Sequence, residues 1–189
     1  MNQTKKLALA AMFVAIGLVL PLLTGSIPEI GMMLLPMHIP VLFCGLICGY
    51  RYGLAVGFVL PLLRAITFGM PPLFPMGISM AFELATYGFV IAIIYGRAQW
   101  SQWRCLLSLF CALILAMIAG RVVWFAAMVV LIGISGEAFT WQMFITAAVL
   151  NSIPGIILQL VLIPSVMLAL NKTGLVPFNV KNNAESVSP

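Results

Sequence analysis

The chain has 189 residues, of which 63% are hydrophobic and only 7% carry a charge, with a formal net charge of +5 at pH 7. A soluble domain has about 25% charged residues, so this composition excludes a domain that is surrounded by water. The sequence predicts an all-α, polytopic membrane protein, a bundle of six transmembrane helices with both termini in the cytoplasm. Residues 1–175 are expected to form this membrane domain, and residues 176–189 a polar cytoplasmic tail.

Six apolar segments qualify as spans, because a span needs about 17–25 apolar residues, and fewer where neighbours shield a short helix. The first follows a lysine pair, as a secretory signal does, but no A-x-A cleavage site comes after it, and we expect it to be retained as a helix. The second span is short and the fifth is long. In chain order, the six cover residues 7–23, 36–49, 52–67, 75–95, 105–133 and 144–170.

Lysine and arginine predict which helix ends face the cytoplasm, because cytoplasmic connections carry an excess of both. With both termini inside, the outer connections hold none of the nine basic residues. The positive net charge therefore reflects membrane topology, and no nucleic acid partner is expected. The inner connections and tails collect Lys5, Lys6, Arg51, Arg97, Arg104, Lys172 and Lys181.

A few polar side chains lie inside the predicted spans, where a charge near the bilayer centre costs at least ~2.5–3.5 kcal/mol. Most fall in the outer half of the bundle, although they come from five different spans. This one-sided grouping predicts a binding pocket open to the exterior and disfavours an ion pathway through the membrane. The candidate substrate-binding residues are His38, Arg64, Glu83, Tyr87, Arg121, Trp124 and Asn151.

Two interpretations of Glu83 remain open at this point. It could form a structural ion pair with Arg64 or Arg121, or it could face a ligand. Tyr87 lies one turn from Glu83, and Trp124 lies three residues from Arg121, so each charge shares a helical face with an aromatic ring. Such a set suits a small polar molecule with a flat or compact body, although either ring could serve packing alone.

The other candidates also have two interpretations. His38 could donate to a backbone carbonyl, and Asn151 could link two helices, since polar side chains in spans often do so. No G-x-x-x-x-G-K-[ST] phosphate loop occurs, so ATP hydrolysis by that route is excluded. The four cysteines form no C-x-x-C pair and there is one histidine, so we expect no metal site, no cofactor and no catalytic residue.

Small residues recur at helical spacing in several spans. Gly45, Gly49, Gly53 and Gly57 predict two faces of close approach, on either side of a turn. For Ala11 and Ala15 in the first span, the pattern alone favours packing within the chain. The connection FGMPPLFPMG joins the spans that carry the third-span arginine and the buried glutamate, and it could be a lid or a rigid crossover.

Three stretches, ALAAMFVA, MHIPVLFCGLICGYRYGLAVGF and LLRAITFGMPPLFPMGISMAFELATYG, resemble the substrate-binding S subunits of energy-coupling factor (ECF) vitamin transporters. The resemblance covers nearly the whole chain. It implies capture of a water-soluble vitamin from outside. It also implies contact of Ala11 and Ala15 with a transmembrane coupling subunit (EcfT-type), and uptake driven by two cytosolic ATP-binding subunits. The implied location is the bacterial cytoplasmic membrane, as a multi-pass protein in the lipid bilayer.

The vitamin itself stays open between two types. Arg64 and Arg121 against Glu83 leave one positive charge, which suits a carboxylate such as pantothenate. If Glu83 faces the ligand while an arginine pairs elsewhere, a hydroxymethylpyrimidine or pyridoxine-like precursor fits better, and MHIPVLFCG and FELATYG resemble that branch of the family. Two other classes remain as alternatives: a membrane-embedded enzyme that uses Glu83 and His38 for proton transfer, and a non-catalytic scaffold subunit.

Overall fold

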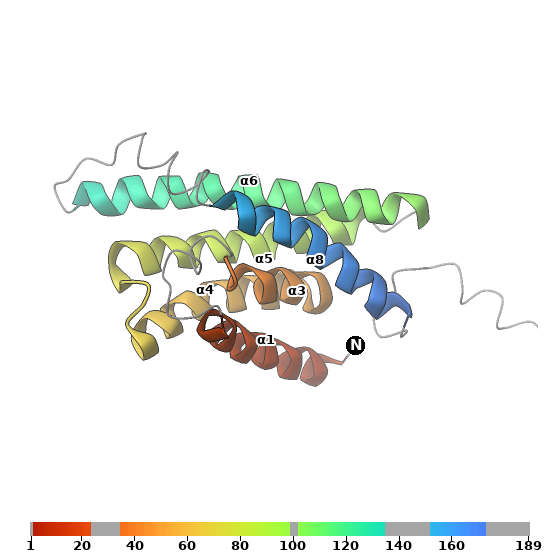
Figure 1. Ribbon diagram of the computed structural model, residues 1–189, viewed down its shortest axis with the longest axis horizontal. Coiled ribbons are helices and arrows are strands. Elements are labelled where there is room, and N and C mark those ends of the chain that lie inside the picture. Colours follow the sequence, from red (N-terminus) through yellow and green to blue (C-terminus); the bar gives the residue numbers. More distant parts are fainter. Residues whose placement is uncertain (1, 24–34, 99–101, 135–151, 173–189) are drawn as a thin grey trace, which may run out of the picture.

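The computed structural model describes residues 2–23, 35–98, 102–134 and 152–172, and within these ranges it is helical (Figure 1). Among the described residues, five helices are long and apolar enough to cross a membrane, and α3, with 11 residues, is shorter. The predicted all-α class is confirmed for this part of the chain, as is the short second segment. The elements are α1 (Gln3–Leu23), α3 (His38–Cys48), α4 (Tyr50–Phe68), the short kinked turn η1 (Leu73–Gly77), α5 (Ile78–Ala98), α6 (Gln102–Ile134) and α8 (Ile153–Lys172).

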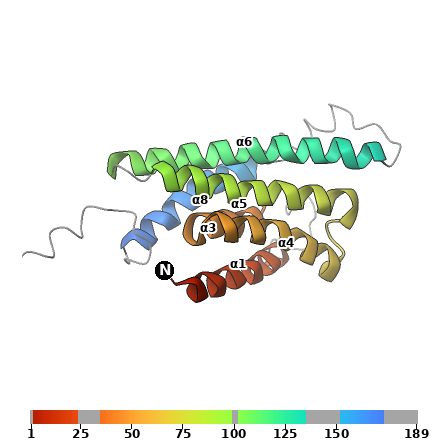
Figure 2. The ribbon, with the colours of Figure 1, turned by 180° about the vertical axis from the view of Figure 1, so that it is seen from behind.

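The helices lie side by side along the long axis of the molecule, with α1 on one flank and α6 on the other (Figures 1 and 2). Helix α5 is central, because it contacts α3, α4 and α6. The first residues of α1 and the last residues of α8 lie at the same end of the bundle, where α5 also ends. Basic residues of α1 and α5 gather at this end, as the predicted topology requires. The side of the membrane that this end faces stays a prediction.

Two glycines end helices where other residues would be strained. Gly49 is the one residue between α3 and α4, and its φ of 93° lies in the region that favours glycine. Gly69 follows α4 in the left-handed conformation, with φ of 69°, and its N–H donates to the carbonyl of Ala65 at 3.0 Å. This arrangement satisfies one of the carbonyls that a helix end leaves without a partner. Both turns follow from the sequence locally.

Glycines also bring α3, α4 and α5 into backbone contact. A Cβ atom added at Gly45 or at Gly53 would lie 2.6 Å from the carbonyl oxygen of Gly88 on α5. One added at Gly57 would overlap the carbonyl of Leu84. The close-approach faces predicted for the second and third spans are therefore confirmed at these three positions, since small residues let helices in a membrane approach closely.

The connection between α4 and α5 packs against three helices and exposes apolar side chains. It contains η1, which packs against α4, α5 and α6, and the Gly77 N–H donates to the carbonyl of Pro72 at 2.8 Å. Met70, Leu73 and Phe74 are about half exposed. Whether this connection opens as a lid stays a prediction.

Candidate functional site

Glu83 lies at the centre of a buried polar cluster where α3, α5 and α6 meet. The side chain projects from the second turn of α5, and the residue is 1% exposed. Its Oε1 atom lies 2.8 Å from Nη1 of Arg121 on α6, and it accepts a hydrogen bond of 3.0 Å from the hydroxyl of Tyr87, one turn further along α5. Of the two arginines proposed as partners for Glu83, the structure selects Arg121. The charge of the carboxylate is thus balanced inside the bundle.

His38 completes the cluster from the first residue of α3. Its Nε2 atom lies 3.8 Å from Oε1 of Glu83, which is too long for a hydrogen bond. Its ring lies 5.1 Å from the ring of Tyr87, tilted by 58°. The side chain is buried, and neither ring nitrogen has a hydrogen-bond partner in the structure. His38 therefore donates to no carbonyl.

Arg121 joins three helices. Besides the ion pair with Glu83, its Nη2 atom donates a hydrogen bond of 2.8 Å to Oγ of Ser152, immediately before α8. Its Nε atom is buried without a hydrogen-bond partner. Ser152 was not among the predicted residues. The sequence around Ser152 indicates only a helix start, because a serine one residue before a helix, with Pro154 in the first turn, is typical of one. It does not indicate contact with Arg121.

An aromatic and sulfur-rich group lies beside the charged residues. Trp124 is one turn from Arg121 on α6 and 4% exposed. It forms a small buried cluster with Met128, against which Met76 and Met80 pack from η1 and α5. Methionine adapts to irregular surfaces and makes favourable contacts with aromatic rings. A wall of this kind can accommodate a flat ring.

One predicted site residue, Arg64, does not join the cluster, and another lies outside the described residues. Arg64 donates a hydrogen bond of 3.0 Å to the carbonyl of Leu18 on α1, and its guanidinium lies over the ring of Phe68. Asn151 lies outside the described residues, and its role stays a prediction.

The cluster has hydrogen-bonding capacity that the protein does not use. Of the four buried side-chain nitrogens without a partner in the structure, three belong to His38 and Arg121, and the fourth is Nε2 of Gln159. An unsatisfied buried polar group costs about 1–3 kcal/mol, so proteins rarely keep three together without a use. His38, Glu83 and Tyr87 are at most 2% exposed, whereas the side chain of Arg121 is 16% exposed. Whether the cluster opens to the exterior stays a prediction.

This arrangement is that of a multi-pass membrane protein with a buried polar cluster between its helices. A family model described as the ECF transporter substrate-specific component matches residues 5–167. The chain belongs to this family, in agreement with the resemblance seen in its sequence. Comparison with curated proteins and with solved structures gives no significant match.

Membership of the family defines the general activity. The chain is a substrate-binding membrane subunit of an ECF transporter, and such a subunit works with a transmembrane coupling subunit and with ATPase subunits. The family is one of transport components, which argues against the alternative of an enzyme that uses Glu83 and His38. In the described part of the chain, no group of three histidine, cysteine or acidic side chains comes together as a metal site.

Proposed function

We propose that the cluster around Glu83 binds a neutral, ring-bearing vitamin or vitamin precursor of the hydroxymethylpyrimidine or pyridoxine type. The observation that carries this proposal is the unused hydrogen-bonding capacity of His38 and Arg121. A heteroaromatic ring with hydroxymethyl groups offers both acceptors and donors to these nitrogens. Trp124 and the methionines around it supply an apolar face against which such a ring can stack.

The balance of charge supports this type of ligand over pantothenate. Arg121 is already neutralised by Glu83 at 2.8 Å, and Arg64 is engaged by α1. A carboxylate ligand would have to compete with Glu83 for Arg121, and the displaced glutamate would be a buried charge without a partner, which costs several kcal/mol. A neutral ring can bind while the ion pair stays intact.

The proposal extends to the route of uptake. The ligand enters from outside, both termini face the cytoplasm, and ATP-driven release depends on the coupling subunit and two cytosolic ATP-binding subunits in a bacterial cytoplasmic membrane. Ala11 and Ala15 support the assignment of α1 as the docking helix, because both are exposed on the outer face of the bundle. Their exposure among the described residues weighs against packing within the chain, which the pattern alone favoured.

The experiment uses the full chain purified in detergent. Mass spectrometry identifies any small molecule that the protein retains, and thermal melting is then measured with pyridoxine, hydroxymethylpyrimidine and pantothenate in turn. A ligand at about 100 times its Kd stabilises the folded state by about 2.7 kcal/mol. We expect a rise in Tm with one of the two ring compounds and none with pantothenate.

The informative variant is His38→Phe, because it removes both free nitrogens and breaks no hydrogen bond that the structure contains. The Tm without ligand should stay the same or rise, while the affinity for the ring compound should fall about tenfold or more. Arg64→Gln is the matched control and should bind normally. Pantothenate binding, or a His38→Phe variant with unchanged affinity, would contradict the proposal.

A further inference from the structure

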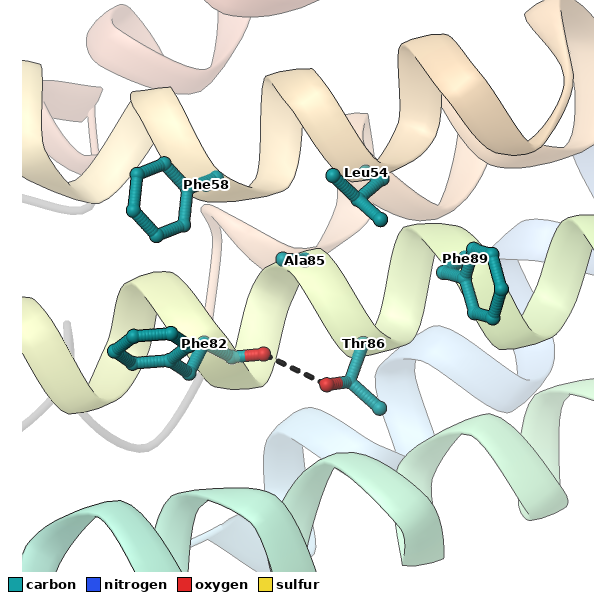
Figure 3. A pocket seen from close by; sticks show the side chains of 6 residues that line it. All are labelled: Leu54, Phe58, Phe82, Ala85, Thr86 and Phe89. Atoms are coloured by element: carbon teal, nitrogen blue, oxygen red, sulfur yellow. Dashed lines mark hydrogen bonds between the residues drawn. The ribbon is translucent and has the colours of Figure 1, made fainter.

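A second feature lies on the opposite side of α5 from Glu83. A groove of about 320 Å³ runs between α4 and α5 (Figure 3). The α5 residues that line it are spaced by three and four positions, so they lie on one face of the helix. This face differs from the one that carries Glu83 and Tyr87. The lining residues are Leu54, Phe58, Phe82, Ala85, Thr86 and Phe89.

The groove is a consequence of the glycine contacts. Because Gly53 and Gly57 touch the α5 backbone, the two helices approach too closely for large side chains to fill the seam. Ala85 forms the floor, and phenyl rings stand on both sides. Phe58 and Phe82 meet edge to face at 5.7 Å across one end.

The lining is suited to hydrocarbon. Thr86 is the one residue of the lining with a polar side chain, and its hydroxyl donates to the carbonyl of Phe82 at 2.8 Å, as the dashed line in Figure 3 marks. Both helices are membrane-spanning by length and composition, so the surface beside the groove faces lipid. A slender hydrocarbon chain can lie along such a narrow groove.

A cation lies one turn beyond the groove. Tyr50 meets Phe89 at 6.1 Å, edge to face, and so extends the aromatic lining toward the first turn of α4. Arg51 is exposed there, its Nε donates to the Tyr50 hydroxyl at 3.1 Å, and its guanidinium lies 5.7 Å from that ring. Tyrosine and arginine at the end of a span are typical of the level of the lipid headgroups.

We propose that this groove binds one acyl chain of an anionic phospholipid, with the headgroup phosphate on Arg51. Apolar walls and a cation at one end match a molecule with a hydrocarbon tail and a negative head. On the expected topology Arg51 faces the cytoplasmic leaflet, where anionic lipids attract basic residues by about 1 kcal/mol each. The site is independent of the vitamin site, since it shares no residue with the cluster around Glu83.

Native mass spectrometry of the purified full chain tests the proposal with phosphatidylglycerol and phosphatidylcholine that carry identical acyl chains. Wild-type protein should retain phosphatidylglycerol about fivefold better. Arg51→Gln should abolish that preference, whereas Arg97→Gln, the charge control at the end of α5, should keep it. Ala85→Phe fills the floor and should reduce binding of both lipids, whereas Val122→Phe adds the same bulk to an exposed face of α6 and should not.

A photoreactive group in the acyl chain of phosphatidylglycerol gives a readout that does not depend on how variants fold. The label should attach to the wild-type segments 54–58 and 82–89, and soluble glycerol phosphate should not compete for it. Labelling elsewhere, or an Arg51→Gln variant with an unchanged preference, would overturn the proposal. So would a lipid-free dimer in which a second copy of the chain covers this face and blocks the label.

Discussion

At the scale of single residues, the burial of Glu83 is explained by its neighbours. Arg121 supplies the opposite charge at 2.8 Å, and the Tyr87 hydroxyl donates to the same carboxylate oxygen. A buried ion pair adds little net stability compared with apolar packing, but removal of one partner leaves an uncompensated charge. Each of the two residues therefore depends on the other to balance its charge inside the bundle.

A double-mutant cycle measures this dependence. Glu83→Gln and Arg121→Gln should each lower the free energy of unfolding by about 3–5 kcal/mol, because each leaves a buried charge alone. The double variant should lose much less than the sum of the two, since residues in contact couple strongly. The measurement is denaturant unfolding of the ligand-free protein in detergent, and additive losses would rule out the ion pair.

At the scale of helices, the arrangement around α5 depends on close backbone contact. Gly88 lies against Gly53, and Gly120 of α6 lies against the ring of Tyr87, where an added Cβ atom would come within 2.6 Å of Cε1. Contacts of this kind replace the hydrophobic effect, which does not drive helix association within lipid. They also position Tyr87 to reach Glu83.

Two alanine substitutions on the same helix test the contact. Gly88→Ala should destabilise the protein by about 1–3 kcal/mol or more, because the new methyl group meets the backbone of Gly53, which cannot move aside cheaply. Gly96→Ala is the matched control, since no atom lies within 4 Å of its added Cβ. It should be neutral or stabilise by about 0.5–1 kcal/mol through helix propensity. Equal Tm values for the two variants would show that the crossing is looser than described.

At the scale of the whole molecule, α1 offers an exposed surface of small residues. Phe13 and Gly17 face the bundle, whereas Ala11 and Ala15 face away from it. Large exposed apolar side chains, Leu7 and Val19, lie along the same helix. This surface shares no residue with the cluster around Glu83, so the two proposed roles, association with the coupling subunit and capture of the ligand, can be tested separately.

Substitution on α1 tests that separation. Ala11→Trp and Ala15→Trp should each reduce copurification with the coupling and ATPase subunits about tenfold or more, because a bulky side chain prevents close helix contact. The rise in Tm with the vitamin should remain that of the wild type. Val122→Trp, on an exposed face of α6, is the control for bulk alone and should assemble normally. Loss of both properties in the α1 variants would mean that the two surfaces are not independent.

Much of this architecture was predictable, because apolar runs and glycine spacing are local features of a sequence. Five predicted segments correspond closely to helices, and the sixth agrees over its described residues from Ile153 onward. The choice of Arg121 over Arg64 as the partner of Glu83 was not predictable, since it depends on how helices distant in sequence cross. Ser152 was missed because a serine before a helix is common, and only the fold brings its hydroxyl to Arg121.

The groove between α4 and α5 could not be predicted from the sequence either. Phe58 and Phe82 are ordinary residues of apolar spans, and nothing in their spacing indicates that they face each other. The contact of Gly57 with α5 brings the two helices close enough for these rings to meet across one end of the groove. Features that depend on the distance between two helices require the structure.

The contacts of Gly45, Gly53 and Gly57 with α5 have a consequence for motion. With no layer of side chains between their backbones, α3, α4 and α5 cannot slide along one another without atomic overlap, so we expect them to move as one rigid body. Helix α6 also packs closely on α5, with Gly120 against the ring of Tyr87, and the Glu83–Arg121 ion pair joins the two helices. If the cluster around Glu83 binds the ligand as proposed, access to it requires the Glu83–Arg121 ion pair to loosen, and the strength of that attraction sets how often the ligand-free protein opens.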